Sequence, residues 1–168
     1  FEDEELKVDD NNKIIEQHKK SRFKSLDCSI MNLADNISYS LHDLEDALSL
    51  GMITERDWEE HFEGKKCLFN DVAGSRENLQ YESIRDALFG LSHERKDAIG
   101  ALVNVMITSC NVYENSSGCE HPLLKFEVKI TSNVEALRKE IFNIVLYKVI
   151  QDENVQQLEF KGQKLIIE

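Results

Sequence analysis

The clearest pattern along the chain is a long run of apolar positions at helical spacing. Successive apolar residues stand three or four positions apart, which is typical of one side of an amphipathic α-helix. Ser25 precedes the run as a candidate N-cap, and Asp27 falls in the first turn, where a negative charge suits the helix dipole. Gly51 follows as a natural C-terminal stop. A helix over about residues 26–50 is therefore predicted, with apolar positions 26, 30, 33, 37, 41, 44 and 48.

The rest of the chain also favours helices. Thr54 is a candidate cap for a second helix, with Trp58 as its buried anchor. Alternating apolar and charged residues over 124–130 indicate one short strand, preceded by a turn-rich loop at 114–121. The predicted fold class is therefore mainly α, with at most one short strand pair. Further helical patterns lie at 76–90, 92–110, 133–149 and 155–168.

Composition agrees with a helical globular chain. One proline and seven glycines among 168 residues leave few helix breakers, and 41% apolar with 31% charged residues is ordinary for a globular protein. The nearly uncharged stretch 98–113 is too short to span a bilayer, so it predicts a buried helix. The first ten residues are acidic, unlike a secretory signal. The protein is therefore expected to be cytoplasmic and not to associate with a membrane.

Charge and cysteine content narrow the function classes further. The cysteines lie far apart with no CxxC pair, which predicts free thiols in a reducing compartment and neither a zinc ribbon nor a disulfide scaffold. The net charge of −12 argues against coating nucleic acid, since affinity for a phosphate backbone needs clustered cations. An anionic nucleotide substrate remains open, because a metal ion and a few local cations can override the global field. The four cysteines are Cys28, Cys67, Cys110 and Cys119.

Residues 1–24 are expected to be polar and irregular. They end in a basic run from His18 to Lys24, which could approach phosphates of a substrate or effector but is more simply a solvated loop. The sequence opens at Phe1 without an initiator methionine, so a fragment or a processed chain is expected.

Three residues on the polar side of the 26–50 helix form the candidate site. At about 100° per residue, Asp35, Tyr39 and Asp43 lie nearly opposite the apolar stripe. The stretch 36–40 is composed of poor helix formers, and such local conflicts tend to mark functional sites. Spacing alone leaves a second interpretation open, in which the acidic residues merely face water and the tyrosine packs on a neighbour. The same side carries Cys28, Met31, His42 and Asp46.

The run from Lys24 to Ala47, KSLDCSIMNLADNISYSLHDLEDA, closely resembles the bacterial dGTPase-like family of the HD superfamily. The corresponding stretch of that family reads approximately A-D-D-I-A-Y-x-x-H-D-L-E-D, a long and distinctive motif. The tail VQQLEFKGQK, residues 155–164, is similar to the far end of the family's HD-associated helical domain. The two matches bracket most of the chain, and the middle is matched only loosely.

The resemblance assigns a role to each candidate. It implies that Asp35 is the final aspartate of the H…HD…D metal set, that Tyr39 lines the nucleotide site, and that Asp43 binds the deoxyribose 3′-hydroxyl. A carboxylate is a suitable hard ligand for Mg²⁺ or Mn²⁺, and residues four apart on a helix can face one ligand together. Asn36 departs from the family pattern, where aspartate is common. This departure should matter little, because the metal ligand is the preceding residue.

The dipeptide His42-Asp43 offers a competing assignment as the HD metal pair. Such a site also needs an upstream histidine on another helix and a later aspartate. His18 lies in a polar, basic stretch, and no later aspartate occupies a comparable helix. The resemblance places His42-Asp43 two turns past the final metal aspartate instead. It follows that the first histidine and the true His-Asp pair of the set are absent from this sequence.

The resemblance implies that residues 1–52 are the C-terminal end of an HD phosphohydrolase domain and that 53–168 are a truncated HD-associated helical domain. The expected protein is a metal-dependent enzyme that cleaves a deoxynucleoside triphosphate, dGTP in the family's name, to deoxynucleoside and triphosphate. It would need the missing N-terminal HD segment and form homo-oligomers. The fragment alone is expected to be inactive and to bind no Mg²⁺ or Mn²⁺. The alternatives are a non-catalytic helical module for oligomerisation or effector binding, and an HD-type phosphodiesterase.

Overall fold

The computed structural model describes residues 2–8, 14–21, 24–70, 72, 79–115 and 121–167. Its backbone contacts divide the chain into two compact units. Unit 1 comprises Phe1–Leu33 and Val112–Lys129, and unit 2 comprises Ala34–Asn111 and Ile130–Glu168. The second unit contains most of the helices and all three candidate residues.

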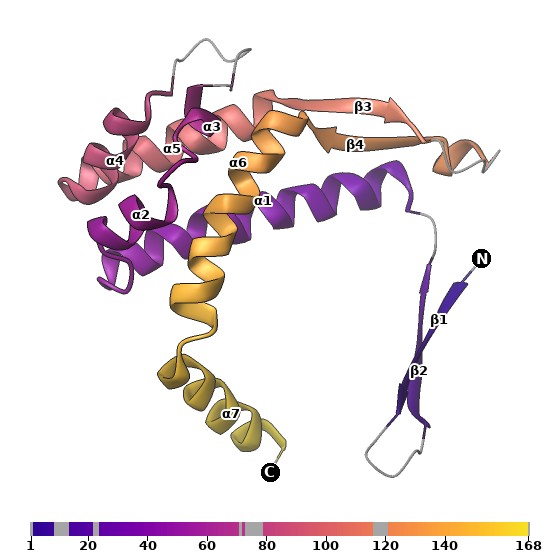
Figure 1. The fold of residues 1–168 in the computed structure, drawn as a ribbon. Coiled ribbons are helices and arrows are strands. Elements are labelled where there is room, and N and C mark those ends of the chain that lie inside the picture. The colour runs from indigo at the N-terminus through magenta and orange to yellow at the C-terminus, as the bar shows by residue number, and fades with distance from the viewer. Residues whose placement is uncertain are drawn as a thin grey trace. The chain divides into compact units, whose positions relative to one another are not determined.

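Helices account for most of the described residues, so the mainly α fold class is confirmed (Figure 1). The longest, α1, is also the element that the sequence pattern predicts most clearly. In unit 2, α5 packs against both α4 and α6, and α3 contacts α6. The helices are α1 (Leu26–Ser49), α2 (Glu55–His61), α3 (Cys67–Asn70), α4 (Tyr81–Phe89), α5 (Ser92–Thr108), α6 (Ser132–Val145) and α7 (Glu153–Ile167), with a 3-10 turn η1 (Pro122–Leu124) and a π-helical turn η2 (Leu146–Ile150) between α6 and α7.

Both ends of α1 are fixed by the residues that the sequence indicated. At the start, the Ser25 hydroxyl accepts a hydrogen bond from the backbone N–H of Cys28 at 3.2 Å. At the end, Gly51 adopts a left-handed φ of 69°. The N–H of Met52 then reaches the carbonyl of Ala47 at 2.9 Å, a six-to-one closure that requires such a residue after the helix. The predicted helix is therefore confirmed together with its capping chemistry.

The apolar stripe of α1 is buried only in its second half. Ile37, Leu41 and Leu44 are buried, whereas Ile30 is 47% exposed. The buried half of the stripe belongs to unit 2, where it joins the main core. This burial fixes which side of α1 faces inward over residues 37–48, and so which side faces outward.

An aromatic cluster forms the second part of the unit 2 core. Trp58, Phe62, Phe69 and Tyr81 are all essentially buried. Their ring centroids lie 4.5 Å apart for Trp58 and Phe62, 5.2 Å for Phe62 and Phe69, and 5.3 Å for Phe69 and Tyr81, with tilted or edge-on planes. Such pairs add roughly 0.5–1.5 kcal/mol beyond the buried area. The predicted anchoring role of Trp58 is confirmed.

The described residues form two strand pairs, one more than the sequence predicts. β3 (Cys110–Glu114) and β4 (Phe126–Ile130) form the sheet that includes the predicted strand. β1 (Glu2–Val8) and β2 (Ile14–Ser21) form an antiparallel pair where an irregular segment and a solvated basic loop were expected. The sequence did not indicate these strands, because neither segment shows a sustained alternation of apolar and polar residues. The facing pairs include Asp3–Lys20, Glu4–Lys19 and Glu5–His18.

Other sequence expectations differ from the structure in detail. Cys110 begins β3 and does not end α5, and α6 begins at Ser132 after the N-cap residue Thr131, one residue before the start expected from the sequence. The start of the helix expected over 76–90 and most of the 114–121 loop lie outside the described residues. Cys28, Cys67 and Cys110 are free thiols as predicted, and Cys119 is outside the described residues. None of the described helices is long and apolar enough to cross a membrane.

The N-terminus of α2 is capped by reciprocal hydrogen bonds between Thr54 and Asp57. The Thr54 hydroxyl accepts from the N–H of Asp57 at 3.2 Å, and the Asp57 carboxylate accepts from the N–H of Thr54 at 2.9 Å. The same carboxylate pairs with Lys148 just beyond α6. The hydrogen bond from Lys148, followed by those from Thr54, lowers the pKa of Asp57 from its usual 3.8 to about 2.

We predict that Asp57→Asn lowers the free energy of unfolding by about 1–2 kcal/mol at neutral pH. Because the pKa of Asp57 is lower in the folded state, its stabilisation is present above the unfolded pKa of 3.8 and is lost as pH falls through about 2. Urea unfolding from pH 7 to pH 2 should show the difference shrinking toward zero. The exposed Glu60→Gln on the same helix should change stability by less than about 0.5 kcal/mol, and a pH-independent Asp57→Asn effect would contradict the assignment.

Candidate functional site

The outward side of α1 presents the three residues that the sequence selected. Tyr39 is 61% exposed, Asp35 is exposed, and Asp43 is half-buried. Ile37, Leu41 and Leu44 occupy the buried side of the same helix. The prediction that Asp35, Tyr39 and Asp43 lie opposite the apolar stripe is therefore confirmed. We call these three residues the α1 site face.

The polar atoms of the α1 site face are available to a ligand. Among the described residues, none makes a hydrogen bond or ion pair with the side chains of Asp35, Tyr39 or Asp43. Partial burial and the nearby carboxylate of Asp46 raise the pKa of Asp43, and the neighbouring His42 opposes them. The face thus combines two carboxylates and one phenol at successive helical turns, a set that can coordinate a cation and accept hydrogen bonds from hydroxyl groups.

A complete metal centre is not found among the described residues. Asp35 has the right chemistry for a hard divalent cation, since exposed carboxylate oxygens suit Mg²⁺ and Mn²⁺. However, within the described ranges no three His, Cys, Asp or Glu side chains are grouped so that they could hold an ion. The same finding leaves His42 and Asp43 without further ligands in that part of the chain, so the competing HD-pair assignment gains no support. Asp35 by itself offers one carboxylate, not a set of ligands.

The poor helix formers at 36–40 have a second explanation that the sequence did not show. Ser40 is fully buried, and its hydroxyl donates to the carbonyl of Asn36 at 2.7 Å. The same oxygen accepts a hydrogen bond from Arg138 of α6 at 3.0 Å. A small hydroxyl is needed here to admit the guanidinium. Part of the propensity conflict therefore serves packing between α1 and α6, within unit 2.

The sequence does not single out Arg138 as a functional residue. It is only 8% exposed and forms two parallel hydrogen bonds of 2.8 Å with the carboxylate of Glu135, one turn earlier on α6. The Arg138 hydrogen bond lowers the pKa of Glu135 more than burial raises it. The i,i+3 spacing of Glu135 and Arg138 was visible in the sequence. Nothing in the sequence indicated that this pair would be buried against α1.

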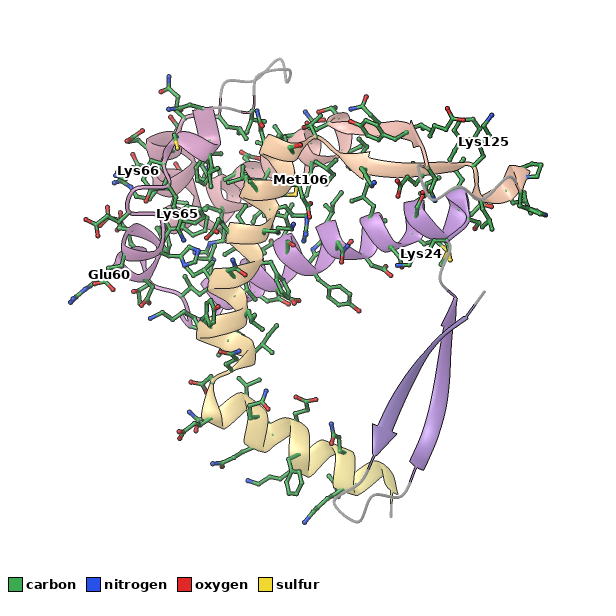
Figure 2. All side chains as sticks on the ribbon, turned by 45° about the vertical axis from the view of Figure 1, so that its right-hand side comes forward. Lys24, Glu60, Lys65, Lys66, Met106 and Lys125 are labelled. Atoms are coloured by element: carbon green, nitrogen blue, oxygen red, sulfur yellow. The ribbon has the colours of Figure 1, made fainter. Side chains whose placement is uncertain are left out.

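A second polar cluster joins the α2–α3 region to α6. The spacing of His61 in the sequence predicts no role for it, yet its Nε2 lies 3.0 Å from the carbonyl and 3.1 Å from the carboxylate of Glu140. Lys65 pairs with the same carboxylate at 2.7 Å (Lys65 is labelled in Figure 2). Burial, followed by the charge of Lys65, lowers the pKa of His61 despite the opposing Glu140. This cluster stabilises the contact of the α2–α3 region with α6, and no role in binding or catalysis is assigned to it.

Known proteins are similar in sequence to about 90% of this chain. The chain is 41% identical over 152 residues to a deoxyguanosinetriphosphate triphosphohydrolase-like protein of Vibrio vulnificus. Proteins of the same name from Vibrio campbellii and Shewanella loihica are 40% and 38% identical over 153 and 154 residues. These matches cover 90%, 90% and 91% of the chain and 34% of each relative.

The chain is thus related to the deoxyguanosinetriphosphate triphosphohydrolase-like proteins. This relationship confirms the resemblance that the 24–47 motif indicated. No family model matches the chain. The chain spans about a third of the length of the curated relatives it matches, so the activity of a whole protein is a separate question.

The electrostatics of this dGTPase-related helix can be tested directly at Asp43. We predict that Asp46→Asn lowers the pKa of Asp43, because it removes the neighbouring negative charge that helps to raise it. His42→Asn should move the same pKa upward, because the imidazole stabilises the carboxylate. The measurement is a carbon-13 NMR titration of the Asp43 carboxyl. Asp27→Asn, at the far end of α1, serves as the control. An Asp43 pKa that is the same in Asp46→Asn and in the unchanged protein would refute the prediction.

Proposed function

We propose that this chain forms the C-terminal part of a metal-dependent deoxynucleoside-triphosphate triphosphohydrolase of the HD superfamily. The substrate class would be dNTPs, with dGTP as the substrate indicated by the names of the relatives. The reaction would be hydrolysis to the deoxynucleoside and inorganic triphosphate. The observation that carries the proposal is the α1 site face, three exposed or half-buried polar residues at successive turns in the stretch that bears the dGTPase-like motif.

Each residue of the α1 site face has a distinct proposed role. Asp35 would contribute one carboxylate to a Mg²⁺ or Mn²⁺ ion whose other ligands lie outside the described residues, and the ion would supply charge stabilisation. Tyr39, one turn later, would line the nucleotide site near the phosphates and the sugar. Asp43 would accept a hydrogen bond from the deoxyribose 3′-hydroxyl, and an ionised acceptor makes such a bond strong.

The proposal includes the organisation of the protein. Residues 1–52 would complete an HD phosphohydrolase domain, and 53–168 would belong to the HD-associated helical domain. The second wall of the active site would come from an N-terminal HD segment. A cytoplasmic homo-oligomer is proposed, acting on nucleotides and not on a membrane or a nucleic acid.

A second candidate function is a non-catalytic helical module that binds an effector or another subunit. The observation in its favour is that the described residues gather no metal-binding cluster. An HD-type phosphodiesterase is a third possibility. Product analysis separates the three, because only the first releases triphosphate and only the third cleaves a cyclic nucleotide.

For the full-length protein, we predict that Asp35→Ala reduces Mn²⁺-dependent release of triphosphate from dGTP by about 100-fold or more, since even residues that only orient metal ligands cost 10–100-fold when changed. The assay separates deoxyguanosine and triphosphate by ion-exchange chromatography for all four dNTPs. Asp27→Ala removes an exposed carboxylate from the same helix, outside the site face, and should retain activity. Equal activity of Asp35→Ala and the unchanged protein would refute the role of Asp35.

We also predict that the 168-residue chain by itself does not hydrolyse dNTPs. The physical reason is that one carboxylate ligand holds a divalent ion too weakly to define a catalytic centre. Isothermal titration with Mn²⁺ should accordingly show no tight site. Triphosphate release by the purified chain that is abolished by Asp35→Ala would contradict this prediction.

A further inference from the structure

The contact between α6 and α1 joins a buried charged residue to the helix that bears the candidate site. It consists of Glu135 and Arg138 on α6 and of Asn36 and Ser40 on α1, all within unit 2. We call these four residues the Arg138 joint. Ser40 is completely buried and Arg138 is 8% exposed, so their polar atoms are shielded from water. Figure 1 shows α6 crossing the second half of α1.

The hydrogen bonds of the Arg138 joint leave the guanidinium little freedom. Nε and Nη2 each donate to a different carboxylate oxygen of Glu135 at 2.8 Å, which fixes the plane of the group. This pairing directs Nη1 toward α1. There Nη1 donates to the Ser40 hydroxyl oxygen at 3.0 Å and lies 3.5 Å from the carbonyl oxygen of Asn36.

On α1, the Arg138 joint contacts the first and the last residue of one helical turn, Asn36 and Ser40. The Ser40 hydroxyl donates to the carbonyl of Asn36 at 2.7 Å, so its oxygen presents a lone pair to Arg138. A serine bonded back to the carbonyl four residues earlier slightly destabilises and often bends a helix. The guanidinium offsets this tendency because it contacts both ends of the same bond. The geometry of this turn therefore depends on α6.

The held turn contains Tyr39 and directly follows Asp35, which are two of the three residues of the α1 site face. Asn36 directly follows Asp35, and Ser40 directly follows Tyr39. A rotation or shift of the Asn36–Ser40 turn would therefore move the side chains of Asp35 and Tyr39 together. Misplacement of a reacting group by about 1 Å can cost about 100-fold in rate. The joint lies on the inner part of the turn and the site face on the outer part, so the two are coupled through the backbone.

We infer that Arg138 is a positioning residue for the active site, which sets the rotation and position of the α1 turn bearing Asp35 and Tyr39. This inference rests on the proposed function and adds to it a residue from the second half of the chain. Lysine cannot replace arginine in this role. Its ammonium is a compact group without the planar fork that pairs with Glu135 and aims a third donor at Ser40.

The test uses the full-length protein and two variants of the joint. Arg138→Lys keeps the charge and removes the fork, and Ser40→Ala removes the hydroxyl that links Arg138 to α1. Two measurements are made on each, kcat and KM for triphosphate release from dGTP, and amide hydrogen exchange of α1 peptides without metal or nucleotide. Arg56→Lys changes an exposed, ion-paired arginine of α2 and is the matched control for Arg138→Lys. Leu102→Ala, in the core of α5, reports the effect of lower stability alone.

The expected result is a kcat that falls about 10–100-fold in Arg138→Lys, with a smaller loss in Ser40→Ala. Amides of the 36–43 segment should exchange faster in both variants. Arg56→Lys should match the unchanged protein. Leu102→Ala should unfold at lower urea concentration while keeping its kcat at temperatures where it is folded. If Arg138→Lys does not fold, Ser40→Ala decides the question alone.

Two outcomes would overturn the inference. One is a folded joint variant whose kcat is unchanged, and the other is a loss of kcat without faster exchange at 36–43. In both, the unchanged protein still releases triphosphate and Asp35→Ala does not, so the proposed function stands. If the unchanged protein releases no triphosphate, the proposed function fails first, and the inference fails with it.

Discussion

The burial of one side of α1 is the constraint on which the candidate site depends. From Ile37 to Leu48 the helix contributes its apolar side to the core of unit 2, with Leu41 and Leu44 almost fully covered. The residues of an α-helix are distributed around a single axis, so those opposite the buried stripe point away from this core. Asp35, Tyr39 and Asp43 occupy that other side. Their accessibility is thus a consequence of packing on the opposite surface of the helix.

The core that receives α1 is itself stabilised in two ways. The aromatic cluster around Trp58 is apolar and requires close packing of large rings. The joint of Arg138 with Glu135 and Ser40 is polar and requires that each buried donor meets an acceptor, since an unpaired buried charge is very unfavourable. The hydrophobic effect itself has no preferred direction. The hydrogen bonds of the joint are directional, so they restrict rotation where the site residues need it most.

Much of the local structure could be predicted because its causes are local. The spacing of apolar residues, Ser25 as the cap and Gly51 as the stop are sufficient to locate α1, and each performs its expected part in the folded chain. The same holds for α2, where Thr54 is the N-cap. The β1–β2 pair was missed, because neither segment has a strand pattern of its own and only the register shows that residue 3 stands opposite residue 20. Strand pairing depends on distant positions, whereas a helix depends on near neighbours.

The sequence by itself determined the mainly helical character, the position of α1 and the motif that relates the chain to dGTPase-like proteins. It also determined that Asp35, Tyr39 and Asp43 share one side of that helix, because the helical repeat fixes their relative directions. Only the tertiary structure decided that this side is uncovered in the described residues and that Ser40 is buried. It also decided that Arg138, almost one hundred positions later, meets the same turn. The physical reason is that side-chain burial depends on which helices come together, and one helix does not specify its neighbour.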